Sequence, residues 1–304
     1  MSMPDDSLAK AKQSSDGFVF GNYRLFRVLR RGTNSTIYLG EHIHLDNKVV
    51  VKVLNNWVAS DDQITKFCAE ARLHASLRHP NIVRILDFGI KGRSPFMVMD
   101  YAANGTLQDY FEPDVAQPIA AVIPFVCSIA SALQYVHNHN IIHRDIKPQN
   151  ILLSRGHEVW LSDFGIAIAV QPGNLHSLQE SIGTALYAAP EQIEGYPLMM
   201  SDQYALAVLV YTWLCGRPPF AGSSLQLCKQ HLYREPLPPH EIVPTISSQV
   251  EKVIMKALAK DPYQRFKHIQ DFAYALRMAD DSYFDAPLRM FGSLQSPREM
   301  HHPS

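Results

Sequence analysis

Cysteine is scarce in this chain of 304 residues, and neither sign of charge is in excess. Four cysteines in a chain of this length are too few for a disulfide framework, and no two of them have the C-x-x-C spacing of a zinc site. We therefore expect a reducing, cytoplasmic setting. Lys and Arg total 28 and Asp and Glu total 29, which leaves a net charge of −1. This balance excludes a bulk basic field, so no nucleic-acid partner is expected, although a local basic patch would be compatible with it.

Long hydrophobic runs are also absent. The densest apolar stretch, residues 204–215, is shorter than the roughly 18–20 residues that span a bilayer, and we interpret it as a buried helix. Charged residues within positions 1–17 interrupt any signal-peptide core, so no membrane segment is expected. Residues 1–17 are predicted to be a disordered leader and residues 281–304 a C-terminal tail.

The first part of the remaining chain has the pattern of β-strands. A nearly continuous β-branched run at 49–53 and looser segments at 23–29 and 36–39 are typical of strands, and two more are expected at 82–86 and 96–99. One helix is predicted at 60–77, where Ser60 is a suitable N-cap and the acids Asp61 and Asp62 suit the first turn.

After residue 105 the pattern becomes helical. Apolar spacing predicts helices at 119–137, 202–215, 247–260 and 268–279, with short strands at 151–153 and 159–161. Pro124 is expected either to kink the first helix or to mark its late start. We therefore predict an α+β fold of two lobes, a β-rich N-terminal lobe at 18–103 and a mainly helical C-terminal lobe at 104–280.

Polar side chains crowd the loop His143-Arg144-Asp145-Ile146-Lys147-Pro148-Gln149-Asn150, which is followed by Asp163-Phe164-Gly165. Asp145 could accept a proton from a hydroxyl nucleophile, and Lys147 could neutralise a transferring phosphoryl group. Asn150 and Asp163 offer hard oxygen ligands that suit Mg²⁺ bound together with phosphates. The alternative is a plain polar loop between two strands, but the whole string matches the catalytic-loop signature of kinases.

Two further charged residues fall among apolar neighbours. Lys52 lies within the β-branched run, and Glu70 lies on the apolar stripe of the helix predicted at 60–77. A buried ammonium or carboxylate needs a partner, because an unpaired buried charge is costly. From the residues alone, their pairing remains one option beside surface positions for either residue.

These motifs together resemble a eukaryotic-type protein serine/threonine kinase, and residues 142–150 resemble its bacterial branch. The resemblance covers about residues 20–279 and includes, in the family's order, Val51-Lys52, Glu70, Asp163-Phe164-Gly165, Gly183-Thr184, Ala189-Pro190-Glu191, Asp202 and Arg265. It implies the bilobal protein kinase fold, ATP and Mg²⁺ as cofactors, and protein substrates with Ser or Thr hydroxyls. Lys147, two residues after Asp145, resembles the serine/threonine class rather than the tyrosine kinases.

The resemblance also implies a role for each matching residue. Lys52 would pair with Glu70 and hold the α- and β-phosphates of ATP. Asp145, Lys147 and Asn150 would complete the catalytic set, with Asn150 and Asp163 as metal ligands. Met99 would be the gatekeeper of the adenine pocket. The nucleotide-binding residues would be Gly32, Ile37, Val50, Lys52, Met99, Asp100, Ala102 and Leu152.

The segment between Asp163 and Glu191 resembles an activation segment. Ser177 and Ser181 are candidate phosphosites or simply solvated loop residues, and Arg144 could bind such a phosphate. The resemblance implies structural roles for three more residues. Glu191 and Arg265 would form a buried ion pair, and Asp202 would support the catalytic-loop backbone.

Four positions depart from the family pattern. The loop that covers the phosphates usually has three glycines and a valine, and here Arg30 and Ser35 replace two of the glycines and Ile37 replaces the valine, so that only Gly32 remains. Val50 stands where alanine is usual above the adenine. A stiffer loop with altered nucleotide contact is expected, because only glycine lets the backbone approach phosphate without a Cβ. A second triplet, Asp87-Phe88-Gly89, precedes the catalytic loop, and we interpret it as a turn ending the strand at 82–86.

His74 occupies a position on the buried face of the 60–77 helix that is usually aliphatic. It is either a satisfied core histidine or a switch whose protonation near its ordinary pKa of ~6.5 would break the Lys52–Glu70 pair.

The leading prediction is an active serine/threonine-protein kinase that autophosphorylates, with a homodimer as a possible partner arrangement. The alternative is a weak or inactive kinase-fold module that signals by binding, which the glycine-poor loop favours. Small-molecule phosphotransfer is a third, less favoured class, because residues 183–191 resemble a peptide-positioning segment.

Overall fold

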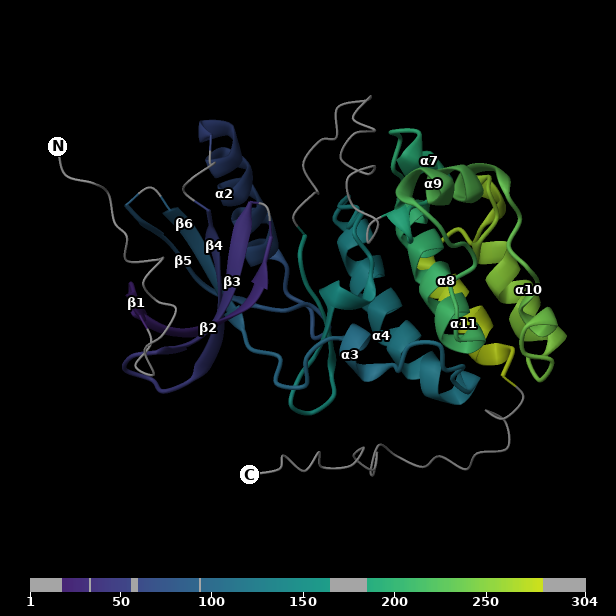
Figure 1. Ribbon diagram of the computed structural model, residues 1–304, viewed down its shortest axis with the longest axis horizontal. Coiled ribbons are helices and arrows are strands. Elements are labelled where there is room, and N and C mark those ends of the chain that lie inside the picture. Colours follow the sequence, from purple (N-terminus) through teal and green to yellow (C-terminus); the bar gives the residue numbers. More distant parts are fainter. Residues whose placement is uncertain (1–17, 33, 56–59, 93, 165–184, 281–304) are drawn as a thin grey trace.

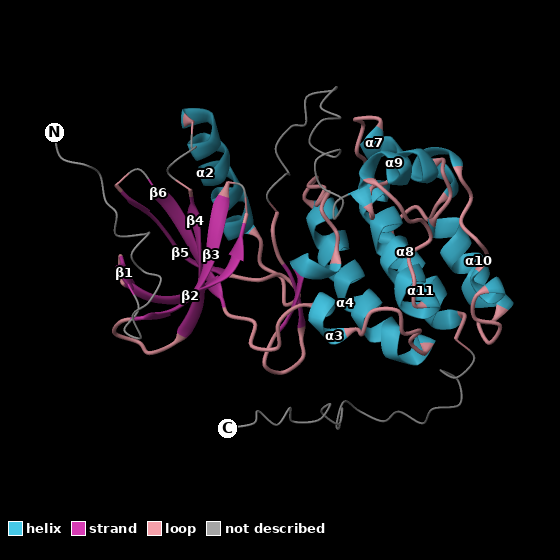
Figure 2. Cartoon of the chain, viewed as in Figure 1, coloured by secondary structure: helices cyan, strands magenta, loops and turns pink. Residues whose placement is uncertain are grey.

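The computed structural model describes residues 18–32, 34–55, 60–92, 94–164 and 185–280. These residues form two lobes side by side, a β-sheet lobe with one long helix and a helical lobe (Figures 1 and 2). The predicted two-lobe α+β architecture is therefore confirmed. The predicted leader and tail lie outside the described residues, as do Ser177, Ser181 and Thr184.

A six-stranded antiparallel sheet forms the N-terminal lobe, in the spatial order β1-β2-β3-β4-β6-β5. The strands are β1 (Phe18–Phe20), β2 (Tyr23–Arg31), β3 (Ser35–His42), β4 (Lys48–Leu54), β5 (Ile85–Lys91) and β6 (Ser94–Asp100). The β-branched run lies in β4, at the middle of the sheet, and its alternate residues Val49, Val51 and Val53 belong to one apolar cluster. Leu54, with Val50 packed beside it, belongs to a second cluster that contains Phe67 of the neighbouring helix. Both faces of β4 are therefore covered, which explains the unbroken apolar pattern.

The helix of this lobe, α2 (Asp61–Ser76), begins where the sequence predicted. The hydroxyl of Ser60 accepts a hydrogen bond from the backbone N–H of Gln63, and the Gln63 side chain accepts one from the backbone N–H of Ser60. This reciprocal capping satisfies two backbone donors that have no partner within the helix.

The C-terminal lobe is built around α8 (Met199–Cys215), which is buried along most of its length. The other elements are α3 (Leu107–Tyr110), α4 (Ile119–Asn138), η1 (Pro148–Asn150), β7 (Ile151–Leu153), β8 (Val159–Leu161), α7 (Pro190–Ile193), α9 (Ser224–Tyr233), η2 (Pro239–Glu241), α10 (Ser248–Ala257), η3 (Pro262–Gln264) and α11 (Ile269–Met278). Helices α4, α8, α10 and α11 share one apolar core. The apolar stretch at 204–215 is thus a core helix, as predicted.

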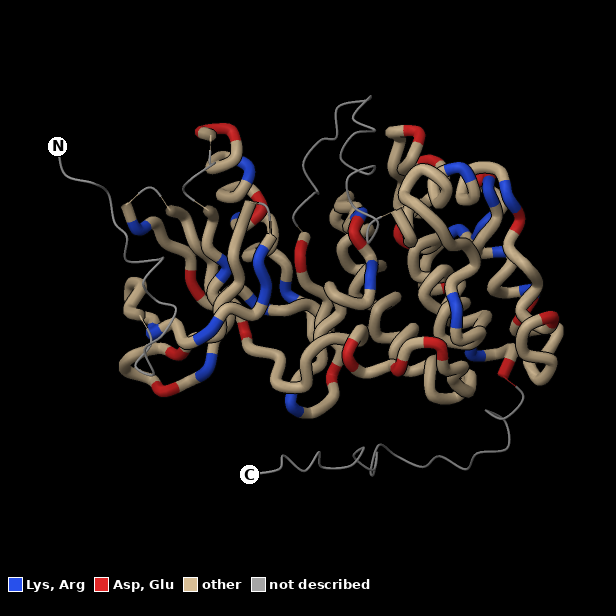
Figure 3. The backbone as a smooth tube through the Cα atoms, in the orientation of Figure 1, with Lys and Arg blue, Asp and Glu red and all other residues tan. Residues whose placement is uncertain are grey.

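Helix α4 includes Pro124 in its interior and begins at Ile119, so the proline does not delay its start. Among the described residues, α4 is the one helix whose length and composition would allow it to cross a membrane, and half of its most apolar window is buried inside the fold. Basic and acidic residues are intermixed over both lobes (Figure 3).

The interpretation of Asp87-Phe88-Gly89 as a turn is wrong. These residues lie within β5, which starts at Ile85 rather than 82 and continues to Lys91. The Asp87 carboxylate accepts a hydrogen bond of 2.9 Å from the Tyr23 hydroxyl and one from the backbone N–H of Phe88. The register shifts between Ile85 and Asp87, an irregularity that a sequence pattern of period two does not predict. The triplet is a structural part of the sheet edge.

Candidate active site

A cavity of about 490 Å³ lies between the two lobes. Six of the predicted nucleotide-binding residues line it: Ile37, Val50, Met99, Asp100, Ala102 and Leu152. Gly32 and Lys52 are not among the lining residues, but Asp163, which contacts Lys52, is. The size and the mainly apolar walls suit a ligand with a flat ring system.

Lys52 forms ion pairs with one residue of each lobe. Its Nζ lies 2.8 Å from Oε1 of Glu70 and 3.0 Å from Oδ1 of Asp163, so the pairing implied by the resemblance is present. Burial by itself lowers the pKa of Lys52, but the carboxylates of Asp163 and Glu70 raise it further than burial lowers it. Lys52 therefore keeps its charge although it is buried.

The carboxylate of Asp163, beside Lys52, is held ionised. Burial tends to raise its pKa, but Lys52 outweighs this effect, with smaller contributions from Arg30 and His143, and the pKa falls to about 2. Its backbone has a φ of +59°, a left-handed conformation that non-glycine residues rarely adopt. Such strain persists where the surrounding structure enforces it, as it often does at functional sites.

Asp202, at the start of α8, holds the backbone of the catalytic loop. Its carboxylate accepts hydrogen bonds from the backbone N–H groups of His143 at 2.9 Å and Arg144 at 2.8 Å. These two bonds hold Arg144 at a φ of +68°. The side chain of His137 in α4 lies 2.7 Å from the same carboxylate. A fully buried carboxylate that accepts three hydrogen bonds has a lowered pKa despite its desolvation.

The next residues of the loop converge on the Asp145 carboxylate. Lys147 Nζ lies 2.7 Å from Oδ2 of Asp145, and Asn150 Nδ2 donates to the same oxygen at 2.8 Å. Both ring nitrogens of His143 have hydrogen-bond partners. Its Nε2 donates to the carbonyl of Ser162, so its Nδ1 is unprotonated and accepts from the backbone N–H of Asp145. The predicted set Asp145, Lys147 and Asn150 is therefore assembled as one hydrogen-bonded group.

The donor set fits Mg²⁺. The backbone N–H of Ser162 donates to the carbonyl of Asn150 at 2.9 Å, so the β7–β8 hairpin brings Asn150 and Asp163 to the same end. Oδ1 of Asn150 is buried and has no hydrogen-bond partner among the described residues. No group of three or more His, Cys, Asp or Glu ligands occurs in the described part of the chain. One carboxylate and one amide oxygen are what Mg²⁺ uses when phosphates and water complete its shell.

Phe164, which follows Asp163, packs against two histidine rings. Its ring is buried and lies 4.8 Å from the His74 ring and 4.9 Å from the His143 ring, measured between centroids. His74 Nε2 donates to the carbonyl of Val83 at 2.8 Å, and burial lowers the pKa of His74 to about 4. His74 is therefore neutral at pH 6, and the hypothesis of a switch near its ordinary pKa is wrong.

The expected structural support of the segment before α8 is present. Arg265 binds both carboxylate oxygens of Glu191, at 2.8 and 2.9 Å, and Ser201 Oγ donates to Glu191 at 2.7 Å. The carbonyl of Arg144 also contacts this region, since it accepts a hydrogen bond of 2.8 Å from Gln192 Nε2. The candidate phosphosites Ser177 and Ser181 lie outside the described residues, so their relation to Arg144 stays a prediction.

Sequence reasoning missed three contributors: Val83, which lines the cavity, His137 and Ser162. Their importance depends on hydrogen-bond partners 9 to 65 residues away in the chain. Only the spacing of His137 from the catalytic loop, at the end of a predicted helix, could have suggested a contact.

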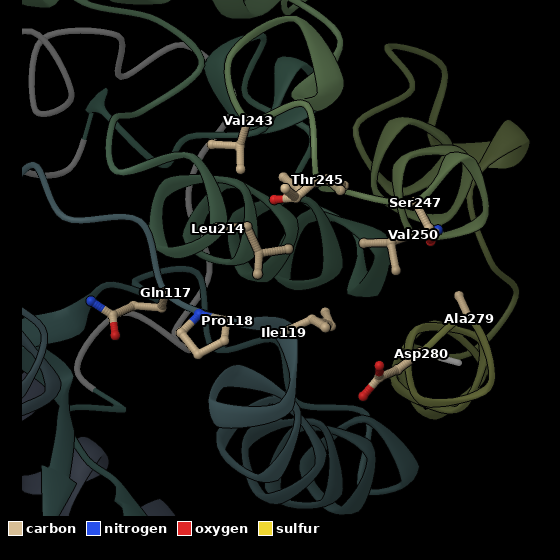
Figure 4. Close-up of a pocket in the computed structure, with 11 residues that line it drawn as sticks. Gln117, Pro118, Ile119, Leu214, Val243, Thr245, Ser247, Val250, Ala279 and Asp280 are labelled. Atoms are coloured by element: carbon tan, nitrogen blue, oxygen red, sulfur yellow. Dashed lines mark hydrogen bonds between the residues drawn. The ribbon is translucent and has the colours of Figure 1, made fainter. Parts of the chain in front are cut away.

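A second cavity, of about 340 Å³, lies among the helices of the C-terminal lobe (Figure 4). Its walls come from the start of α4, the ends of α8 and α11, and α10 with the loop before it. None of the predicted site residues lines it, whereas six of the predicted nucleotide-binding residues line the cavity between the lobes.

Comparison with known proteins agrees with this geometry. The sequence profile described as "Protein kinase domain" matches residues 23–278. The chain belongs to the protein kinase family. It is 34% identical over 267 residues to the serine/threonine-protein kinase PrkC of Bacillus subtilis and 37% identical over 253 residues to PknB of Mycobacterium leprae. These matches cover 87% and 81% of this chain.

The serine/threonine-protein kinase Pkn1 of Myxococcus xanthus is 36% identical over 286 residues, or 90% of this chain. The recognition of a eukaryotic-type kinase of the bacterial branch is thereby confirmed. The chain spans only about two fifths of the length of these relatives, 40% to 41%.

Proposed function

We propose that this chain is an active serine/threonine-protein kinase domain that transfers the γ-phosphate of ATP to protein hydroxyls with the help of Mg²⁺. The continuous chain of contacts from Glu70 through Lys52 to Asp163 carries the proposal. Phosphoryl transfer requires placed charges rather than covalent catalysis by the protein, and these three side chains place one cation and one ionised metal ligand together.

Each residue of the catalytic loop has a task in this proposal. Asp145 orients the attacking hydroxyl and accepts its proton, while Lys147, 2.7 Å away, neutralises charge that develops on the phosphoryl oxygens. Asn150 and Asp163 would hold Mg²⁺, which supplies neutralisation of the phosphate charges. Lys52 would contact the α- and β-phosphates, and Glu70 keeps the ammonium in place.

The test is transfer of radiolabelled phosphate from ATP by purified protein, with Asp145→Asn as the comparison. Asp145→Asn should reduce transfer by about 100- to 10,000-fold, the range of general-base catalysis, while ATP binding persists. Transfer at the wild-type rate by Asp145→Asn would contradict the mechanism. A melting-temperature shift with Mg-ATP checks that the variant still folds and binds the nucleotide.

The second candidate is a kinase-fold module that acts by binding. Arg30 and Ser35 at the glycine positions favour it. A wild-type protein that shows the melting shift with Mg-ATP but no transfer to itself or to a generic protein substrate would support this candidate.

Two further parts of the proposal concern the setting. Serine or threonine side chains of proteins are proposed as substrates, including a second copy of this chain in a transient homodimer. Autophosphorylation whose specific rate rises with protein concentration would support the second copy. A cytoplasmic setting is proposed as well, and the four unpaired cysteines support a reducing compartment.

A further inference from the structure

Arg30 lies on β2 at the position of the first glycine of the family's phosphate-covering loop. It is exposed, it lines the cavity between the lobes, and its side chain has no hydrogen bond or ion pair with another described residue. A guanidinium that faces this cavity and makes no hydrogen bond with the described residues is available to a ligand. Arginine also matches phosphate oxygens with its fork of donors.

The sheet register places Arg30 in line with Lys52. Arg30 is paired with Ile37 on β3, and Ile37 is paired with Lys52 on β4. Residues directly opposite one another on neighbouring strands share a face of the sheet. Arg30, Ile37 and Lys52 therefore form one row on the cavity face, and two inter-strand spacings of ~4.8 Å put the Cα atoms of Arg30 and Lys52 about 10 Å apart.

The neighbouring residue Arg31 lies in the next row. It is paired with Thr36, which is buried and donates its hydroxyl to Oδ1 of Asn55 at 2.8 Å. Asn55 Nδ2 in turn donates to the carbonyl of Gly32 at 3.3 Å, and the backbone N–H of Gly32 donates to the carbonyl of Ser35. The hairpin between β2 and β3 is thus closed by its own hydrogen bonds and by Asn55.

We propose that Arg30 is a phosphate-binding residue of this site, and that its guanidinium supplies from the side chain the contacts that loop glycines supply through their backbone N–H groups. The inference rests on the proposed function, because it assumes that ATP occupies this cavity. Arg30 would contact the polyphosphate from the N-terminal lobe, and Lys52 would contact it from deeper in the cavity. Arg30 lines the same cavity as Asp163, the proposed metal ligand at its phosphate end.

The experiment compares the binding of Mg-ATP and of adenosine, measured by calorimetry, in wild type, Arg30→Ala and Arg31→Ala. Arg30→Ala should weaken Mg-ATP binding by about tenfold, the scale of one charge-assisted hydrogen bond at a solvent-accessible position, and change adenosine binding less than about twofold. Arg31→Ala is the matched control. It removes the same charge from the neighbouring position, and the Arg31 side chain does not line the cavity. It should leave both affinities within about twofold, since its charge is exposed and screened.

Three results would overturn the proposal: unchanged or tighter Mg-ATP binding in Arg30→Ala, an equal loss for adenosine, or an equal loss in Arg31→Ala. Added salt should weaken Mg-ATP binding more in wild type than in Arg30→Ala, because one screened contact is missing from the variant. Transfer assays on the same proteins separate the two proposals. Arg30-dependent ATP binding without any transfer by wild type would contradict the kinase activity and support the role of Arg30, whereas absence of ATP binding by wild type would overturn both.

Discussion

The two walls of the cavity between the lobes are built differently. On the helical side, the loop from His143 to Asn150 is held by buried hydrogen bonds to Asp202 and Ser162. On the sheet side, residues 30–32 and 34 are exposed, and hydrogen bonds connect Gly32 to Ser35 and to Asn55. The catalytic-loop positions Asp145, Lys147 and Asn150 that the resemblance implied are all kept on the first wall, whereas both glycine replacements lie on the second.

This difference follows from burial. A substitution in the catalytic loop leaves buried donors or acceptors without partners, which costs about 1–3 kcal/mol for each group. A substitution in the exposed hairpin leaves its groups to water, so the hairpin accepts Arg30 at little cost to the fold. Variation in nucleotide contact is therefore concentrated on the sheet side.

The largest expected effect comes from the residue that connects the two walls. Lys52→Met should lower the transfer rate by at least about 100-fold, because it removes the charge that contacts both carboxylates and that we propose contacts the phosphates. Glu70→Gln should lower it less, because the lysine keeps Asp163 as a partner. Initial rates at saturating ATP measure both variants, and an equal or larger loss in Glu70→Gln would contradict the assigned roles.

Asp202→Asn tests the support of the helical wall. The amide cannot accept from His143, Arg144 and His137 at once, so the free energy of unfolding should fall by about 2–4 kcal/mol, with a lower transfer rate. Denaturant unfolding measures this change. Asp271→Asn is the control, because Asp271 accepts a backbone hydrogen bond at an exposed helix start, where a loss of about 0.5 kcal/mol is expected. Equal losses of unfolding free energy in the two variants would show that the buried hydrogen bonds to Asp202 stabilise the fold no more than an exposed one does.

His74 tests whether the interface between the walls responds to pH. Its folded pKa of about 4 is below the unfolded value of ~6.5, so the unfolded chain binds more protons between these values and stability falls as the pH drops through this window. His74→Leu should therefore lose less stability than wild type between pH 6.5 and pH 4. Melting temperatures measured across this range check the difference in slope.

The same pKa predicts no role for His74 in activity near neutral pH. Wild type and His74→Leu should lose transfer activity in parallel between pH 7.5 and pH 6. If the leucine variant alone kept its activity at pH 6, the folded pKa of His74 would have to be much higher than about 4.

The smallest effect is expected at the ceiling of the adenine pocket. Val50→Ala should tighten ATP binding by on the order of 1 kcal/mol, because it relieves a crowded contact of the kind that overpacked cores show. Calorimetry with ATP measures this change. Weaker binding in Val50→Ala would mean that the valine methyl groups contribute favourable contact rather than crowding.

Much of the architecture could be predicted from local patterns. The β4 run and the Ser60 cap depend on neighbours within a few residues, so their signals are contained in the sequence itself. The start of β5 was misplaced because its register shift at Ile85–Asp87 and the bond from Tyr23 are decided by a strand far away in the chain. Pro124 was ambiguous for the same reason, since packing against the core determines whether a helix continues through a proline.

The sequence by itself determined which chemical groups are present and in what order, because the strings around Asp145 and Asp163 have few other uses. It left open whether the isolated charges Lys52 and Glu70 pair with one another. Only the tertiary structure decided which of these groups meet. It gathered three donors on Asp202 and left Oδ1 of Asn150 without a hydrogen-bond partner among the described residues. It also kept His74 neutral and aligned Arg30 with Lys52 across two strands. The physical reason is that hydrogen bonds, burial and pKa depend on distances in space, and long-range packing sets these distances.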